Sequence, residues 1–123
     1  SYRGHRYEMH ALAYDPTGPR VLTGSHDMTA RLWTTSGVLL EELKHPGVVY
    51  DAIFAPNGDI LTACGDGNIR IFAAADLQHP RVLAGHKGNV YSLALAGARL
   101  YSSGEDKTVR AWEDGKIVAT SVR

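Results

Sequence analysis

Histidine, hydroxyl and aspartate side chains recur three times in this chain in the same order, and together they could perform nucleophilic chemistry. A serine or threonine hydroxyl activated by a histidine, which an aspartate orients, is the arrangement found in many hydrolases. Each hydroxyl follows its histidine by 18, 17 or 16 residues, the aspartate follows four residues later, and a large aromatic residue six residues after that. The three sets are His5, Thr23, Asp27 and Trp33; His45, Thr62, Asp66 and Phe72; and His86, Ser102, Asp106 and Trp112. A spacing this regular indicates one structural unit repeated about every forty residues.

Short strands must position these residues. Each unit divides into four segments of alternating, β-branched or aromatic residues, separated by turn-forming Gly, Pro, Asn and Asp. No stretch has the 3.6-residue apolar period of a helix, which excludes helical repeats. The chain is therefore predicted to be all-β, with meandering antiparallel sheets. The expected strands are 8–14, 20–25, 29–34 and 38–43; 48–54, 59–64, 68–73 and 79–84; and 90–96, 99–103, 108–112 and 117–122.

The units resemble WD40 repeats, whose signature is an early Gly-His and a late Trp-Asp in a four-stranded propeller blade. Gly4-His5 and Gly85-His86 match the first element, and the segments that end in Trp33 and Trp112 match the second closely. The middle unit is a weaker copy that ends in Phe72, and no unit has an aspartate directly after its aromatic residue. The resemblance covers almost the whole chain and implies three four-stranded antiparallel blades of a β-propeller.

Three blades form an incomplete ring, because propellers close with about 4–8 blades. The open sheet faces would be covered either by the rest of a longer protein or by identical copies of this chain. We favour the first, because Ser1–Arg3 looks like the end of an outer strand that would compete with the last residues of a neighbouring copy. The expected divisions are 1–3, the end of the outer strand of a preceding blade; 4–43, blade 1; 44–84, blade 2; and 85–123, blade 3.

The resemblance implies that each set of four residues forms a buried structural tetrad and not a catalytic triad. In such a tetrad the histidine and the tryptophan N–H both bond the hydroxyl, and the aspartate holds the histidine from the tight turn. The first and third sets can complete this network. The middle set cannot, because Phe72 has no N–H, so Thr62 is expected to bond elsewhere. We expect no enzyme activity and no cofactor.

Propellers with such tetrads are usually rigid platforms for proteins, an inference that rests on family resemblance. In the family, partner contacts concentrate three and five residues after the histidine and at the residue before the aspartate. These positions are Glu8, His10 and His26; Val48, Tyr50 and Gly65; and Asn89, Tyr91 and Glu105. Tyr50 and Tyr91 are candidate interface anchors, and packing between blades is the alternative.

The leading hypothesis is a non-catalytic protein-interaction scaffold, a structural subunit of a larger assembly. One alternative is a ubiquitin-binding or other adaptor propeller in protein turnover, because residues 56–72 resemble a blade of ubiquitin-binding WD40 propellers. A second is a self-assembling propeller closed by identical copies. An enzyme or a nucleic-acid binder is the remaining class.

The charge, cysteine and histidine content of the chain bears on these functional hypotheses. Lys plus Arg and Asp plus Glu both total 13, so no net charge draws the chain to nucleic acid or to a membrane surface. The single cysteine, Cys64, fits a reducing intracellular compartment, cytoplasmic or nuclear. His10, His26 and His79 are far apart in sequence and form no His/Cys ligand cluster, so we expect no metal.

Overall fold

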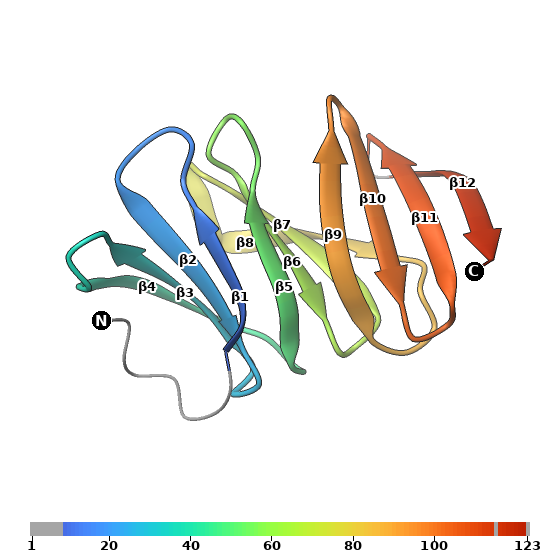
Figure 1. Cartoon of the computed structure of the whole chain (residues 1–123), viewed down its shortest axis with the longest axis horizontal. Helices are drawn as coiled ribbons and strands as arrows, with labels where there is room; N and C mark the ends of the chain where they lie inside the picture. The colour runs from blue at the N-terminus through green and yellow to red at the C-terminus, as the bar shows by residue number, and fades with distance from the viewer. Residues whose placement is uncertain (1–8, 115, 123) are drawn as a thin grey trace.

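The computed structural model describes residues 9–114 and 116–122, and these residues form strands and turns only. Twelve strands make three four-stranded antiparallel sheets, in each of which strands that follow one another in sequence are neighbours (Figure 1). The all-β prediction and its three four-stranded sheets are confirmed, and the ring they form is not closed. The strands are β1 (Met9–Tyr14), β2 (Arg20–Ser25), β3 (Thr29–Thr34) and β4 (Leu39–Lys44); β5 (Val49–Phe54), β6 (Ile60–Cys64), β7 (Asn68–Ala73) and β8 (Asp76–Ala84); and β9 (Val90–Ala96), β10 (Arg99–Gly104), β11 (Thr108–Glu113) and β12 (Lys116–Val122).

Strand β8 differs most from its predicted range, because it begins at Asp76 and not at residue 79. Ala73 pairs with Asp76, which leaves a turn of only two residues between β7 and β8. Pro80 lies well inside the strand, whereas in the predicted range it is the second residue. The sheet accommodates this proline because β8 is its outer strand, and an edge strand has one row of N–H groups that needs no partner.

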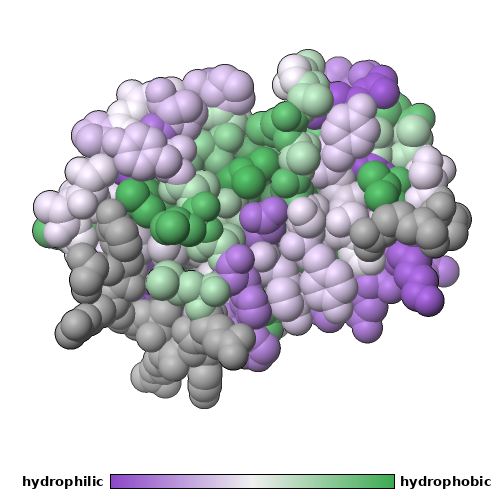
Figure 2. Space-filling model, in the orientation of Figure 1, coloured by the Kyte–Doolittle hydropathy of each residue, from purple (hydrophilic) through white to green (hydrophobic). Residues whose placement is uncertain are grey.

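The two ends of the sheets carry different connections. At one end, which we call the hairpin end, turns join β1 to β2, β5 to β6, and β9 to β10 (top of Figure 1). At the opposite end, the histidine end, lie the turns 26–28, 65–67 and 105–107 and the connections between sheets, 45–48 and 85–89. A notch opens at the hairpin end between the second and third sheets, and hydrophobic residues are visible inside it (Figure 2).

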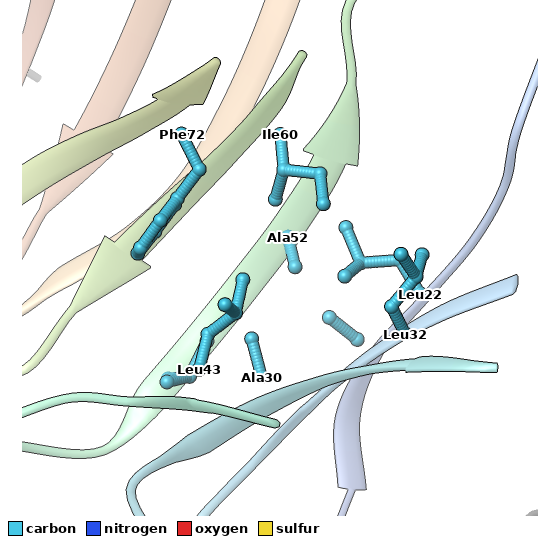
Figure 3. Close-up of a cluster of buried hydrophobic side chains, with 9 residues drawn as sticks. Leu22, Ala30, Leu32, Leu43, Ala52, Ile60 and Phe72 are labelled. Atoms are coloured by element: carbon cyan, nitrogen blue, oxygen red, sulfur yellow. The ribbon is translucent and has the colours of Figure 1, made fainter. Parts of the chain in front are cut away.

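Two apolar cores lie between neighbouring sheets. Side chains of the first sheet point toward those of the second (Figure 3): Leu22, Ala30, Leu32 and Leu43 face Ala52, Ile60 and Phe72. The second core joins Leu61, Ala63, Ile69 and Leu83 of the second sheet to Val90, Leu93, Leu100 and Trp112 of the third. Each fully buried Leu or Ile contributes about 1.5–3 kcal/mol. Most of the stabilisation therefore arises between sheets, so each sheet depends on its neighbours.

One face of the first sheet has no such neighbour among the described residues. The residue seven positions after the histidine is Leu12 in the first unit, Ala52 in the second and Leu93 in the third. Ala52 and Leu93 are 1% and 6% exposed because the preceding sheet covers them, whereas Leu12 is 70% exposed. Tyr14, two residues further along β1, is also exposed.

Buried tetrads and a candidate interaction surface

The third sheet brings His86, Ser102, Asp106 and Trp112 into one hydrogen-bonded network. His86 lies in the connection before β9, Ser102 in β10, Asp106 in the following turn and Trp112 in β11. Trp112 Nε1–H donates to Ser102 Oγ at 2.8 Å, and Ser102 Oγ lies 2.7 Å from His86 Nε2. His86 Nδ1 lies 3.1 Å from Asp106 Oδ1. All four groups are satisfied if Ser102 donates to Nε2 and Nδ1–H donates to the carboxylate.

The carboxylate of Asp106 also organises the backbone of the turn. It accepts hydrogen bonds from the Lys87 and Thr108 N–H groups and from the Thr108 hydroxyl, the last at 2.7 Å. Burial opposes ionisation of this carboxyl, but the bonds from Thr108, Lys87 and His86 outweigh it and hold its pKa well below the usual range. Asp106 therefore remains an acceptor at neutral pH.

This network is closed to solvent. Ser102 is 2% exposed and His86 8%, and the serine hydroxyl bonds two buried groups, the Trp112 N–H and His86 Nε2. A nucleophile must be free to approach its substrate, and this hydroxyl is buried with its donor and acceptor roles already used. The geometry is that of a buried polar cluster in which every member is paired.

The second sheet forms a shorter version of the network. His45 Nδ1–H donates to the Leu43 carbonyl at 3.0 Å, which leaves Nε2 to accept from the Thr62 hydroxyl at 2.8 Å. Phe72 occupies the position of the tryptophan, and its ring centre lies 5.6 Å from that of His45. The expectation that Thr62 bonds elsewhere is therefore wrong, because Thr62 keeps its bond to the histidine and lacks only the indole donor. Burial, aided by the charge of Arg70, lowers the pKa of His45 to about 4.

Asp66 does not hold His45, and it contacts Arg70 instead. Two nitrogens of the Arg70 guanidinium bond the two carboxylate oxygens at 2.6 and 3.2 Å. Burial opposes ionisation, but these bonds hold the pKa of Asp66 at about 2. A bidentate arginine is a stronger partner for a carboxylate than one imidazole N–H, which accounts for the difference from the third sheet.

Sequence reasoning missed these arginines, although their spacing is also repeated. Arg31, Arg70 and Arg110 each follow the aspartate of their unit by four residues. Their partners differ. Arg31 pairs with Glu42 at 2.8 Å, Arg70 with Asp66, and Arg110 contacts Asp106 at 3.3 Å. The repeat identified the position, but the neighbouring strand decides which carboxylate is within reach.

The lowered pKa of His45 predicts acid sensitivity. Below pH 6.5 an unfolded chain binds a proton at this histidine, and the folded chain does not until the pH approaches 4. The stabilisation is therefore complete above pH 6.5 and is lost as the pH falls toward 4, by on the order of 2–3 kcal/mol. Urea unfolding at several pH values should show this loss, and His45→Gln should have a flatter profile in the same window. Identical slopes for the two proteins would contradict the assignment.

The first sheet shows part of the same arrangement. Trp33 Nε1–H donates to Thr23 Oγ1 at 2.9 Å, and both side chains are buried. Asp27 accepts from the N–H and the hydroxyl of Thr29, as Asp106 does from Thr108. His5, the remaining member of this set, lies outside the described residues, as do Glu8 and the expected strand end at 1–3.

A row of aromatic rings crosses all three sheets at the histidine end. The Tyr50 ring meets the Tyr91 ring edge-on with centres 4.9 Å apart, and on its other side it lies 5.3 Å from the ring of His10. His10 Nε2 is 3.3 Å from Nδ1 of His26. Tyr91, His10 and His26 are exposed, and Tyr50 is partly buried. Burial, with smaller contributions from Tyr91 and Glu105, raises the pKa of Tyr50.

The other predicted contact positions lie along this row. The Asn89 side chain donates to the Tyr91 hydroxyl, and the Asn89 N–H donates to the Glu105 carboxylate. Gly65 lies between them and Tyr50, because a Cβ on this glycine would be 3.0 Å from Asn89 Oδ1 and 3.5 Å from the Tyr50 ring. The Gly65 N–H donates to the Val48 carbonyl. We call the eight residues together the aromatic row: His10, His26, Val48, Tyr50, Gly65, Asn89, Tyr91 and Glu105.

Two further groups bear on the chemistry of this chain. Cys64 is a fully buried free thiol, and burial raises its pKa, which disfavours the reactive thiolate. His10 and His26 are adjacent although they are far apart in sequence, but in the part of the chain that the structure describes no three His, Cys, Asp or Glu side chains gather as metal ligands. No helix long and apolar enough to cross a membrane occurs in residues 9–114 and 116–122.

The sequence profile of the WD domain, G-beta repeat, matches residues 1–34, 37–72 and 77–113, which is one match for each sheet. The chain belongs to the WD40 repeat family. The three sheets are accordingly WD40 blades, and we refer to them as blades 1, 2 and 3 in chain order.

Similar proteins in this family differ widely in their names. A WD repeat-containing protein of Schizosaccharomyces pombe is 32% identical over 113 residues, which are 89% of this chain and 31% of that protein. Transducin beta-like protein 3 of Bos taurus is 31% identical over 125 residues, 94% of this chain and 15% of the relative. A candidate E3 ubiquitin-protein ligase of Lotus japonicus is 36% identical over 91 residues, 72% of this chain and 6% of the relative. The chain thus spans less than a third of each of these proteins.

Proposed function

We propose that this chain is a non-catalytic platform for protein partners, and that it works as a structural part of a larger assembly. The observation that carries the proposal is the aromatic row, which continues across three blades at one end of the sheets. Tyrosine is enriched where proteins bind one another, because a rigid ring buries a large area while its hydroxyl keeps a polar contact. Tyr91 is 42% exposed and is held in place by Asn89, so it is both accessible and oriented.

In this proposal Tyr50 and Tyr91 both pack between blades and bind a partner protein. Tyr50 and Tyr91 contact each other across the boundary between blades 2 and 3, and such an edge-on pair contributes about 0.5–1.5 kcal/mol. The pair still leaves aromatic surface in solvent. A surface already fixed by its own contacts loses little conformational entropy when a partner binds.

The closed tetrads support the non-catalytic part of the proposal. Ser102 and His86, the residues that a hydrolase would use, are buried and saturated with intramolecular hydrogen bonds. We infer no activity for this chain from the name of the Lotus japonicus relative, because the match covers only 6% of that protein. We also place the protein inside the cell, in the cytoplasm or the nucleus, because its one cysteine is a free, buried thiol.

The exposed face of blade 1 supports membership of a larger propeller. Leu12 occupies a position that is buried in blades 2 and 3, and the counterparts of Tyr14 there, Phe54 and Leu95, are partly buried. Monomeric proteins rarely leave such apolar surface open. In this proposal a further blade of the same propeller covers them, as blade 1 covers Ala52 and blade 2 covers Leu93. Closure by identical copies is the alternative.

A double substitution tests the interaction surface. Pull-downs with the intact protein from its native cell extract should recover partners, and Tyr50→Ala with Tyr91→Ala should reduce that recovery by roughly tenfold or more, because two anchor side chains are lost. Val82→Ala, an exposed apolar residue of the outer strand β8, is the matched control and should change nothing. Equal recovery with the double variant would contradict the proposal, and a protein that no longer folds would assign the tyrosines to packing.

A further inference from the structure

The hairpin end carries an apolar groove between blades 2 and 3. It has a volume of about 320 Å³, and Figure 2 shows hydrophobic residues in the notch at this place. Leu61 and Ile71 form the wall on blade 2, and Leu95 forms the wall on blade 3. Pro56 and Asn57 of one turn and Gly97 of another lie at its rim. The groove is at the opposite end of the sheets from the aromatic row.

The equivalent space between blades 1 and 2 is filled. Phe54, nine residues after His45, packs against the first core, and the Arg20 guanidinium lies over its ring, 5.8 Å from the ring centre. The two turns also touch there, since a Cβ on Gly58 would be 3.3 Å from the Thr17 hydroxyl. As a result Leu32, at the base of this space, is only 2% exposed.

Two differences between the repeats open the space between blades 2 and 3. Leu95 stands where Phe54 stands in the preceding unit, and it is a smaller side chain. The turn before β10 is shortened to two residues, and a Cβ on Gly97 would have no atom within 4 Å, so this turn does not reach its neighbour. Ile71, the counterpart of Leu32, is consequently left partly exposed.

A third difference between the repeats reverses the charge at the groove. Arg20 lies three residues before the hydroxyl of its unit, and Asp59 holds the same position in the next unit. The Asp59 carboxylate accepts hydrogen bonds from the Ala74 N–H at 2.9 Å and from the Asn57 side chain at 3.2 Å. Among the described residues no cation pairs with it, so a negative charge stands beside an unfilled apolar surface.

We propose that this groove binds a segment of a partner protein that presents an aromatic side chain next to an arginine or lysine. The chain itself supplies the pattern, because an aromatic ring with a guanidinium over it fills the same space one blade earlier. The aromatic ring packs on Leu61, Ile71 and Leu95, and the basic group pairs with Asp59. The volume is sufficient for one such side chain and not for a folded element.

The test uses the dipeptide N-acetyl-Phe-Arg-amide as the probe and the intact protein labelled at isoleucine and leucine methyl groups. Titration should shift the NMR signals of Leu61, Ile71 and Leu95. N-acetyl-Phe-Glu-amide should bind about threefold to fivefold more weakly, since one exposed ion pair is replaced by a repulsion. Leu95→Phe copies the residue that fills the equivalent space at blade 2. It should weaken binding of the Phe-Arg probe by about tenfold or more, because the new ring occupies the space that the probe's aromatic side chain needs. An unchanged affinity in this variant would overturn the proposal.

Asp59→Asn provides a second variant that keeps the acceptor for the Ala74 N–H. It should remove the preference for the Phe-Arg probe over the Phe-Glu probe while it leaves the groove signals responsive. Shifts confined to other methyl groups would overturn the proposal. So would a dimer of the intact protein that Leu95→Phe dissociates in sedimentation, because a second copy would then be the occupant.

Discussion

Replacing Ser102 with alanine is expected to destabilise the protein by about 2–4 kcal/mol. The hydroxyl is the centre of the blade 3 tetrad, where it accepts from the Trp112 N–H and donates to His86. Alanine is nearly the same size, so packing changes little, but two buried polar groups lose their partner. Each such group costs about 1–3 kcal/mol when it is left unpaired. Urea unfolding of the intact protein measures the change.

Thr62→Val is the matched control for this substitution. It also removes a buried hydroxyl, with a methyl group of similar size in its place, but in blade 2 only His45 loses a partner, because Phe72 has no N–H. The expected cost is about 1–2 kcal/mol, roughly half that of Ser102→Ala. Equal costs for the two variants would show that the indole donor contributes nothing, and would remove the physical basis for calling the blade 3 residues a tetrad.

The turn-forming residues and the alternation of side chains along each segment were sufficient to predict the strands, because both are local properties of the sequence. Eleven of the twelve strands begin within one residue of the predicted position. The start of β8 is the exception, because the strand begins three residues before the predicted range and runs through Pro80, which is tolerated since β8 lies at the edge of its sheet. The edge position is a property of the sheet and not of the segment.

Side-chain partners in the tetrads were less predictable. The lack of a donor at Phe72 follows from its chemistry alone. The capture of Asp66 by Arg70 does not, because the sequence places an arginine four residues after every aspartate and only geometry selects among Asp66, Asp106 and Glu42. The pairing of His10 with His26 was missed for a similar reason, since residues 16 positions apart meet only through the register of β1 and β2.

The groove between blades 2 and 3 depends on a difference between repeats. The shortening of the units is visible in the sequence as the decreasing distance from histidine to hydroxyl, 18, 17 and then 16 residues. Its consequence is visible only when neighbouring turns are placed together, one in contact and one apart. Repetition predicts the shared architecture, and departures from repetition predict where a ligand could bind.

The central claim is that a further blade of the same propeller covers the face of blade 1 that carries Leu12. Leu12 and Leu93 occupy the same position of their blades, one 70% and the other 6% exposed. If a further blade covers Leu12 in the intact protein, a carboxylate there would be buried without a partner, which costs several kcal/mol. If the face is open, the same carboxylate would be solvated and harmless.

The most direct measurement is the thermal unfolding of the intact protein with Leu12→Asp, compared with Leu93→Asp as the buried reference. Val38→Asp, in the exposed turn between β3 and β4, is the solvated reference. We predict that Leu12→Asp lowers the melting temperature as severely as Leu93→Asp. A melting temperature equal to that of Val38→Asp would contradict the claim, because the face of blade 1 would then be open to water.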